Sequence, residues 1–311
     1  MKSRRTFLAL GTVGFFLLFS WLGVIGADTA SAKSFWIDHA DVDVTVRDDG
    51  ALIVTENITF DFSGSFSGAY RDIPIRPGET ISDIVVSDAG GPYRLGGCTD
   101  LGCFSPAGTY GYVQYLDVVR IVWHHDSTDV ARTFTIDYVM EGVATAYADV
   151  LDVNLQVWGD QWAVGLDDLD ARIHAPGNPT PGEVLVWGHP FGISGATSLG
   201  VDGVTPTLEA KDVPAERWVE LRGVFPVSVL TSTDGARNVA GAGLDTIRAE
   251  EQQFTEDAEA ARRASGIGLI VGIAAILGIA GGLGLVTYLR YGREPRVDYD
   301  RAYEQEPPTD L

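Results

Sequence analysis

The chain is poor in the residues and motifs that mark most catalytic and metal-binding folds. Its 311 residues include only 2 cysteines, 2 methionines and 5 histidines. It has no G-x-S-x-G nucleophile elbow, no H-E-x-x-H zinc helix and no phosphate-binding glycine loop. These absences exclude the common signatures of serine hydrolases, zinc peptidases and nucleotide-binding enzymes. We therefore expect a protein that is not an enzyme and has no cofactor and no metal.

The two cysteines lie close together. Four residues separate Cys98 from Cys103, and in an oxidising compartment such a pair forms a local disulfide. A ring this small constrains the unfolded chain by only about 2 kcal/mol, so it shapes a loop more than it holds a fold. A zinc site needs about four ligands, and no histidine is near in sequence, which makes metal binding the weaker alternative.

Basic residues are also scarce. The chain has 22 Lys and Arg against 43 Asp and Glu, for a net charge of -21. The segments outside residues 33–265 hold equal numbers of acidic and basic residues, so the whole imbalance falls within 33–265. Such a field repels nucleic acid, which we exclude as a partner. No calcium-loop motif accompanies the acidic residues, and Asp48-Asp49-Gly50 is typical of a hairpin turn.

Charge is absent from two long apolar runs, the first of which is N-terminal. A basic start with Arg4 and Arg5 precedes the run at 6–26, and small residues at 30–32 offer a cleavage site. This arrangement predicts a signal peptide over residues 1–32. The paired arginines also resemble a twin-arginine signal, so both this route and the general secretory route stay open.

The second run covers residues 266–289 and is followed by four arginines. Its length fits a helix that crosses a bilayer. The positive-inside rule then places residues 290–311 in the cytoplasm as a short tail. These features predict a single-pass protein of the bacterial cell membrane, with residues 33–243 on the outer side.

Short runs of alternating apolar and polar residues fill the region 33–243. They cover residues 42–46, 52–62, 118–123, 133–140, 150–158, 183–187 and 218–229, with turn-forming clusters such as 63–68 and 176–182 between them. This pattern predicts an all-β domain, an antiparallel β-sandwich with immunoglobulin-like architecture. One large sandwich and two small ones in series both fit its length.

Glu56 interrupts the apolar face of its strand. A carboxylate that faces a core needs a partner, and Arg71, which follows the loop at 63–68, is a candidate. We expect a structural ion pair between them, and a ligand-contacting pair is the alternative.

The histidines give little sign of a metal site. His124-His125-Asp126 falls between two strand runs and is predicted to form a hairpin turn. His39, His174 and His189 stand alone, and we expect them to be surface histidines or histidines with satisfied hydrogen bonds.

An acidic and aromatic segment, 147–162, is the strongest candidate for a site. Its relevant residues are Asp149, Asp152, Trp158, Asp160 and Trp162. Carboxylates beside aromatic platforms are typical of glycan binding, and of glycosidases where two carboxylates pair. Asp149, Asp152, Trp158 and Trp162 are therefore candidate glycan-binding residues, and a strand pair with a solvated edge is the alternative interpretation.

Residues 244–265 change to a helical pattern rich in Ala, Glu and Gln, which predicts a membrane-proximal stalk. Its apolar seam, which includes Ile247 and Phe254, is interrupted by Glu251. Small residues then recur on one face of the apolar run, at Gly268, Gly272, Ala275 and Gly282. Such residues let helices approach closely, so homo-oligomerisation through this helix is predicted.

Three segments carry a resemblance to a known family. They are ADVDVTVRDDGALIVTENITFDFSGSFSGAYRDIPI (40–75), FTIDYVMEGVATAYADVLDVNLQVWGDQW (134–162) and YLRYGREPRVDY (288–299). Together they resemble the YciQ-like bacterial membrane proteins, the domain-of-unknown-function 2207 family. The resemblance implies a signal, an exported β-rich domain and a transmembrane helix, and it brings no enzymatic activity. Members of this family usually continue past the segment that corresponds to residues 306–308 into a cytoplasmic region. The resemblance therefore also implies that the chain is either a short form or a truncated sequence.

These observations predict a membrane-anchored envelope protein whose β-sandwich is a binding or interaction module. The ligand would be an envelope protein, a glycan or a neighbouring copy. The alternative is a cell-surface hydrolase of carbohydrates. A hydrolase would need two carboxyl groups about 5 to 10 Å apart in one concave pocket, and a binding module would not.

Overall fold

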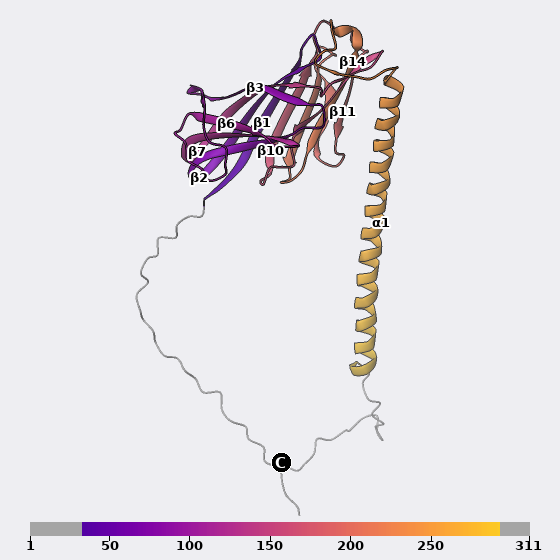
Figure 1. Ribbon diagram of the computed structural model, residues 1–311. Helices are drawn as coiled ribbons and strands as arrows, with labels where there is room; N and C mark the ends of the chain where they lie inside the picture. Colours follow the sequence, from indigo (N-terminus) through magenta and orange to yellow (C-terminus); the bar gives the residue numbers. More distant parts are fainter. Residues whose placement is uncertain (1–32, 293–311) are drawn as a thin grey trace, which may run out of the picture.

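Two β-sheets followed by one long helix make up the part of the chain that the structure describes (Figure 1). The computed structural model describes residues 33–292, except the side chains of 265–275 and 291. The predicted signal peptide at 1–32 and most of the predicted tail, 293–311, lie outside the described residues.

The larger sheet has ten strands. They are β1 (Ser34–Val46), β2 (Leu52–Pro74), β3 (Thr80–Asp88), β4 (Gly91–Pro92), β5 (Arg94–Leu95), β6 (Thr109–Gln114), β7 (Val118–Glu141), β10 (Leu166–His174), β12 (Ser194–Leu199) and β13 (Pro206–Val213). Their order is β12-β13-β10-β1-β2-β7-β3-β4, and β6 pairs with both β7 and β5.

The smaller sheet has five strands in the order β11-β14-β9-β8-β15. They are β8 (Thr145–Ala146), β9 (Val150–Trp158), β11 (Leu185–His189), β14 (Val219–Pro226) and β15 (Arg237–Asn238). A short 3-10 helix, η1 (Val227–Val229), follows β14, and the long helix α1 spans Leu244–Tyr291.

The hairpin of β1 and β2 shows how the sequence pattern builds the larger sheet. Every second residue of β1 from Ala40 to Val46 is buried, as a strand with one face on the core requires. The turn between the strands reaches Gly50, whose φ of +88° favours glycine. A Cβ at Gly50 would lie 2.7 Å from the Cβ of Ala236, so this position has no room for a side chain.

β2 and β7 are longer than the sequence pattern predicts. They pair along most of their 23 and 24 residues. The predicted loop at 63–68 and the predicted turn at 124–126 are therefore wrong, because both segments lie within these strands. Two bulges in β2 absorb the irregular residues, so the pairing continues past them. His125 in β7 is buried, and burial lowers its pKa to about 4.

The strand arrangement differs from an immunoglobulin-like sandwich, so that part of the fold prediction is also wrong. β1 pairs in parallel with β10 in the middle of the ten-stranded sheet, although the other neighbours of both strands are antiparallel. The immunoglobulin architecture instead divides seven to nine strands between two sheets of similar size. The β-rich character of the domain agrees with the prediction.

One continuous hydrophobic core joins the two sheets. The largest side chains in it with almost no exposed surface are Phe60, Trp123, Phe134, Trp158 and Phe225. Residues from β2 and β7 in one sheet and from β9 and β14 in the other meet there. The two sheets are therefore held together by burial of aromatic and branched side chains.

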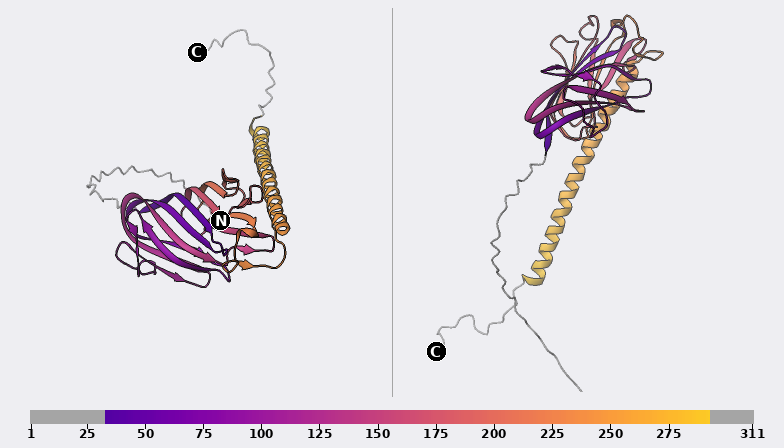
Figure 2. Two further views of the ribbon diagram at one scale, coloured as in Figure 1. Left: turned by 90° about the horizontal axis from the view of Figure 1, so that it is seen from above. Right: turned by 60° about the vertical axis from the view of Figure 1, so that its left-hand side comes forward.

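Helix α1 begins against the outer face of the smaller sheet, beside β11 and β14, and then extends away from the domain (Figures 1 and 2). Ile247 packs there on Val150 and Val224. The carboxylate of Asp149 accepts the backbone N–H groups of Gly243 and Leu244, at 2.7 and 3.3 Å. These bonds satisfy donors that a helix N-terminus leaves unpaired.

Among the residues that the structure describes, no helix combines the length and the apolar character needed to cross a membrane. The predicted transmembrane helix at 266–289 is contradicted by this finding. Of the predicted association residues, Gly268, Gly272 and Ala275 fall outside the described side chains. A Cβ at Gly282 would meet nothing within 4 Å.

Candidate functional site

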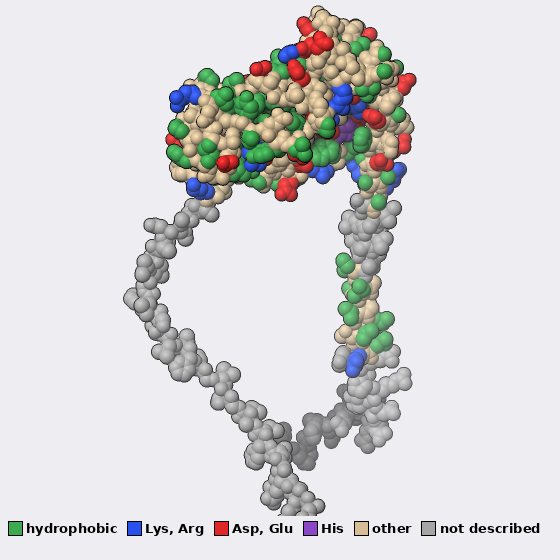
Figure 3. Space-filling view, viewed as in Figure 1, with side chains coloured by type: hydrophobic (Ala, Val, Ile, Leu, Met, Phe, Trp, Pro, Cys, Tyr) green, Lys and Arg blue, Asp and Glu red, His purple; other side chains and the backbone are tan. Residues whose placement is uncertain are grey.

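An aromatic pocket opens at the end of the larger sheet that is formed by the start of β1 and the middle of β2. Its volume is about 160 Å³. Six aromatic side chains line it, together with Arg71, Asp72 and Gln161; they are Phe35, Phe60, Phe62, Phe66, Tyr70 and Trp162. Hydrophobic side chains reach the surface over this part of the domain, away from the helix (Figure 3).

Strand geometry brings the rings of this pocket together. Phe60 and Phe62 are two residues apart on β2, so they share one face, and their rings stack at 5.6 Å between centroids. Phe35 of β1 is the cross-strand partner of Phe62. Phe66, which follows the first bulge of β2, lies 4.9 Å from the ring of Phe62. The bulge therefore turns a further ring into the pocket.

Arg71 forms the inner wall of the pocket and is only 2% exposed. Its guanidinium donates to both carboxylate oxygens of Glu56 at 2.9 and 3.1 Å, and Tyr138 donates to the same carboxylate at 2.7 Å. A further bond runs from Arg71 Nη1 to the carbonyl of Asp72 at 2.8 Å. Burial would lower the pKa of Arg71, but the charge and hydrogen bonds of Glu56 raise it.

The pocket also holds a hydrogen-bond donor that lacks an acceptor. Trp162 is 7% exposed, and its indole Nε1 has no partner among the described residues. The ring lies 5.5 Å from the guanidinium of Arg71 and stacks on Trp158 at 4.9 Å. A buried donor without a partner costs free energy.

The four predicted glycan-binding residues do not form one site. Asp149 caps α1, and Asp152 is bonded to Arg222 in the smaller sheet. Trp158 is in the core with 1% exposure, and only Trp162 lines the aromatic pocket. Asp152 and Trp158 are six positions apart on β9, so regular alternation would place them on one face. The pairing of β9 with β14 shifts register between Val219 and Glu220, so the two side chains have different surroundings.

A second buried arginine, Arg222 of β14, joins the smaller sheet to α1. It donates to Asp152 at 2.9 and 2.6 Å and to Glu251 of the helix at 2.7 Å. Glu250 accepts two longer bonds from it, and His189 Nε2 lies 2.9 Å from the other oxygen of Glu251. Burial raises the pKa of Glu251, but the bonds from His189 and Arg222 outweigh this and lower it.

No single stretch of sequence predicts this junction, because its residues come from four separate elements, β9, β11, β14 and α1. The one available signal was Glu251, which occupies an apolar position in the helical pattern, as Glu56 does in its strand. His189, expected to be a surface or a satisfied histidine, is buried and bonded to Glu251.

Two carboxylates share a further pocket of about 120 Å³ between the end of β2 and the strands β9 and β14. They belong to Glu79 and Glu220. Burial raises the pKa of Glu220, whereas Glu79 accepts hydrogen bonds from the backbone and the side chain of Arg76. Asn154 Oδ1 in the same pocket is buried and has no partner among the described residues.

The disulfide between Cys98 and Cys103 is present, which confirms that prediction. It closes a loop between β5 and β6 that carries exposed Leu101 and Phe104.

Comparison with solved structures gives only distant likenesses. A protein described as nutrient-binding, from Legionella pneumophila, has a TM-score of 0.36 and 10% identity over 61% of this chain and 66% of its own. An M1 zinc metallopeptidase from Deinococcus radiodurans has a TM-score of 0.35 and 12% identity, and the match covers 61% of this chain and 42% of the peptidase. A protein described as a protease, from Parabacteroides distasonis, has a TM-score of 0.33 and 11% identity over 61% and 40%. Likenesses at this level carry no information on activity.

The comparison with curated proteins gave no match. A family model, described as the N-terminal domain of a predicted membrane protein (DUF2207), matches residues 36–225. This match covers more than half of the chain and confirms the resemblance found in the sequence. The chain therefore belongs to the DUF2207 family of predicted membrane proteins.

Proposed function

We propose that the β-domain is a binding module whose aromatic pocket holds one ring, or an apolar group of similar size, from its ligand. The pocket itself is the observation that carries this proposal. An apolar cavity of about 150 Å³ holds one benzene-sized molecule, and this pocket has about 160 Å³.

The test is binding of benzyl alcohol, whose ring matches the pocket in size, to the full-length protein in detergent. Saturation-transfer NMR should detect saturable binding. Ala69 lines the pocket, so Ala69→Leu should fill it and abolish the signal. Ala107 lies on the exposed disulfide loop, and Ala107→Leu should leave binding unchanged. Equal binding by both variants would contradict the proposal.

We further propose that this domain lies on the outer side of the membrane. Disulfides persist in oxidising compartments and are rare in the cytosol, and Cys98 and Cys103 are joined. Protease added to intact cells should therefore cut the domain. Protection in intact cells, with cutting only after lysis, would contradict this location.

A second candidate function, a carbohydrate hydrolase, is favoured by the pocket of Glu79 and Glu220 alone. A raised pKa suits Glu220 to donate a proton to a leaving group, and Glu79, which accepts hydrogen bonds from Arg76, is the second carboxylate of the pocket. Chromogenic glycosides test this role directly. Turnover that disappears in Glu220→Gln would support it, and the absence of turnover in the unaltered protein would contradict it.

A further inference from the structure

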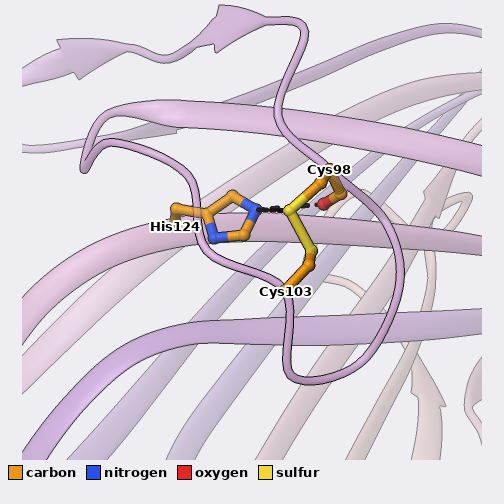
Figure 4. Close-up of side chains that lie close together, drawn as sticks. All are labelled: Cys98, Cys103 and His124. Atoms are coloured by element: carbon orange, nitrogen blue, oxygen red, sulfur yellow. Dashed lines mark hydrogen bonds between the residues drawn. A yellow bond between two sulfur atoms is a disulfide. The ribbon is translucent and has the colours of Figure 1, made fainter.

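The disulfide loop meets a histidine from a distant part of the chain. Cys98 Sγ lies 3.9 Å from Nε2 of His124, which comes from β7, 26 positions later (Figure 4). The two sulfur atoms and the nearest imidazole nitrogen all lie within 4.8 Å of one another. Two thiolates and one imidazole are a ligand set for Zn²⁺ and other thiophilic ions.

Main-chain bonds hold this loop in place without the disulfide. The N–H groups of Gly96 and Gly97 both donate to the carbonyl of Tyr110 in β6, at 2.9 and 2.8 Å. A Cβ at Gly111 would lie 2.1 Å from the carbonyl oxygen of Gly97, so the loop rests directly on the strand. Cys103 N–H donates to the carbonyl of Asp100 at 3.1 Å. The two cysteines therefore stay close when the bond between their sulfur atoms is broken.

The surroundings of the two sulfur atoms differ. Ser105 Oγ donates to Cys98 Sγ at 3.3 Å, and Nε2 of His124 lies 3.9 Å from the same sulfur atom. Donors on a sulfur atom stabilise its thiolate and make it the better leaving group. An external thiol would therefore attack Cys103 and release Cys98 as the thiolate. Both cysteines are partly exposed, so a small thiol can reach the bond.

We propose that this loop is a redox-gated metal site, closed in the disulfide form and opened by a dithiol reductant to bind Zn²⁺ through Cys98, Cys103 and His124. The dithiol supplies two electrons and two protons and becomes a cyclic disulfide, which leaves two cysteine thiols. Zn²⁺ then displaces both thiol protons. His124 Nε2, which donates to the Cys98 carbonyl at 3.0 Å in the disulfide form, exchanges that hydrogen bond for the metal, and its proton moves to Nδ1 of the same ring through solvent. Water completes the four ligands that zinc prefers.

Zinc binding by the full-length protein in detergent tests this proposal. The protein is reduced with dithiothreitol, freed of reductant without oxygen, and titrated with Zn²⁺ against a chromophoric chelator. We expect one equivalent to bind to the reduced protein and none above background to the oxidised protein. The double variant Cys98→Ser/Cys103→Ser measures the background from the acidic surface. Equal binding by the oxidised and reduced forms, or by the double variant, would overturn the proposal.

The histidine is tested separately. Even outer partners of a metal ligand change zinc affinity by about tenfold or more, so His124→Ala should lose at least that much. His124→Cys keeps a metal ligand and should bind zinc, which separates ligation from packing if the alanine variant folds poorly. His174, which is partly exposed and pairs with Asp43, provides the control, and His174→Ala should bind as the unaltered protein does. Unchanged affinity in His124→Ala would remove the histidine from the site and overturn the proposal.

Discussion

Two arginines are buried among the described residues, and their charges are balanced in different ways. Arg71 has one carboxylate, Glu56, and both belong to β2. Arg222 meets the carboxylates of Asp152, Glu250 and Glu251, and two of these three come from α1. The Arg71 pair is therefore neutral, and both of its residues belong to one strand. The Arg222 cluster has more negative than positive charges, and it joins the smaller sheet to α1.

This difference determines what each cluster can stabilise. Breaking the Arg71 pair leaves an unbalanced charge on a guanidinium that is only 2% exposed and is held within the sheet. Breaking the Arg222 cluster leaves charges between a sheet and a helix end, and that end can move away and hydrate them. The first cluster should therefore control the stability of the whole domain, and the second should control the attachment of α1.

Glu56→Gln should have the largest effect. Arg71 cannot lose its proton, so the substitution leaves a buried cation without a counter-charge and should lower the free energy of unfolding by about 3–5 kcal/mol. Urea unfolding followed by tryptophan fluorescence measures this change. Lys211→Met removes an exposed pair with Asp168 and should change it by less than about 0.5 kcal/mol. Unchanged stability of Glu56→Gln would show that the pair is not structural.

Arg222→Met should weaken the attachment of the helix by about 2 kcal/mol, because the released carboxylates can hydrate once α1 lifts. Hydrogen exchange should become faster in residues 244–254 and stay unchanged in β2 and β7. Arg248 is exposed on the same turns of the helix, and Arg248→Met is the matched control. Faster exchange throughout both sheets would place Arg222 in the same class as Arg71.

Glu251→Gln should cost only about 1 kcal/mol, the loss of one charged hydrogen bond. Asp152 and Glu250 still balance Arg222 in this variant, whereas Glu56→Gln leaves Arg71 without any carboxylate. Glu56→Gln and Glu251→Gln are the same substitution in the two clusters, so their effects can be compared directly. Urea unfolding measures the effect on the stability of the domain, and hydrogen exchange measures the effect on α1. Equal costs at both positions would refute the distinction.

Lowering the pH should have the smallest effect on the attachment of α1. Protonation of Glu251 should weaken this attachment by no more than Glu251→Gln does. The pKa of Glu251 is lower in the folded chain than its ordinary 4.5, so its contribution is complete above pH 4.5. It is lost as the pH falls through the folded value. Exchange in residues 244–254, measured relative to Glu251→Gln at each pH, should therefore approach that of the variant below pH 4.5. A constant difference across this range would contradict the assignment.

The sequence predicts elements whose pattern is local. The run at 150–158 matches β9, and the change to a helical pattern at 244 matches the start of α1. The strands β10, β12 and β13 were not predicted, because their many polar residues obscure the alternation of apolar and polar residues. The lengths of β2 and β7 were missed as well, since bulges break the period without ending the pairing.

Sites are harder to predict because they depend on contacts between distant residues. Glu56 and Arg71 are 15 positions apart, and one polar residue on an apolar face was enough to suggest a partner. His124 and the two cysteines, or His189 and Glu251, have no common signal along the chain. The pairing of β6 with β7 brings His124 to the disulfide loop, and the packing of α1 on the smaller sheet brings Glu251 to His189.

The parallel pairing of β1 with β10 has a consequence for how the protein is made. Asp41 and Arg172, which pair across these strands, are 131 positions apart. The ribosome synthesises β1 and β2 before β10. The edge of β1 that pairs with β10 therefore stays unpaired until β10 has been synthesised. An open edge of this kind readily recruits strands from other nascent chains. Slow translation between these two strands would therefore lengthen the interval in which the newborn chain is most prone to aggregate.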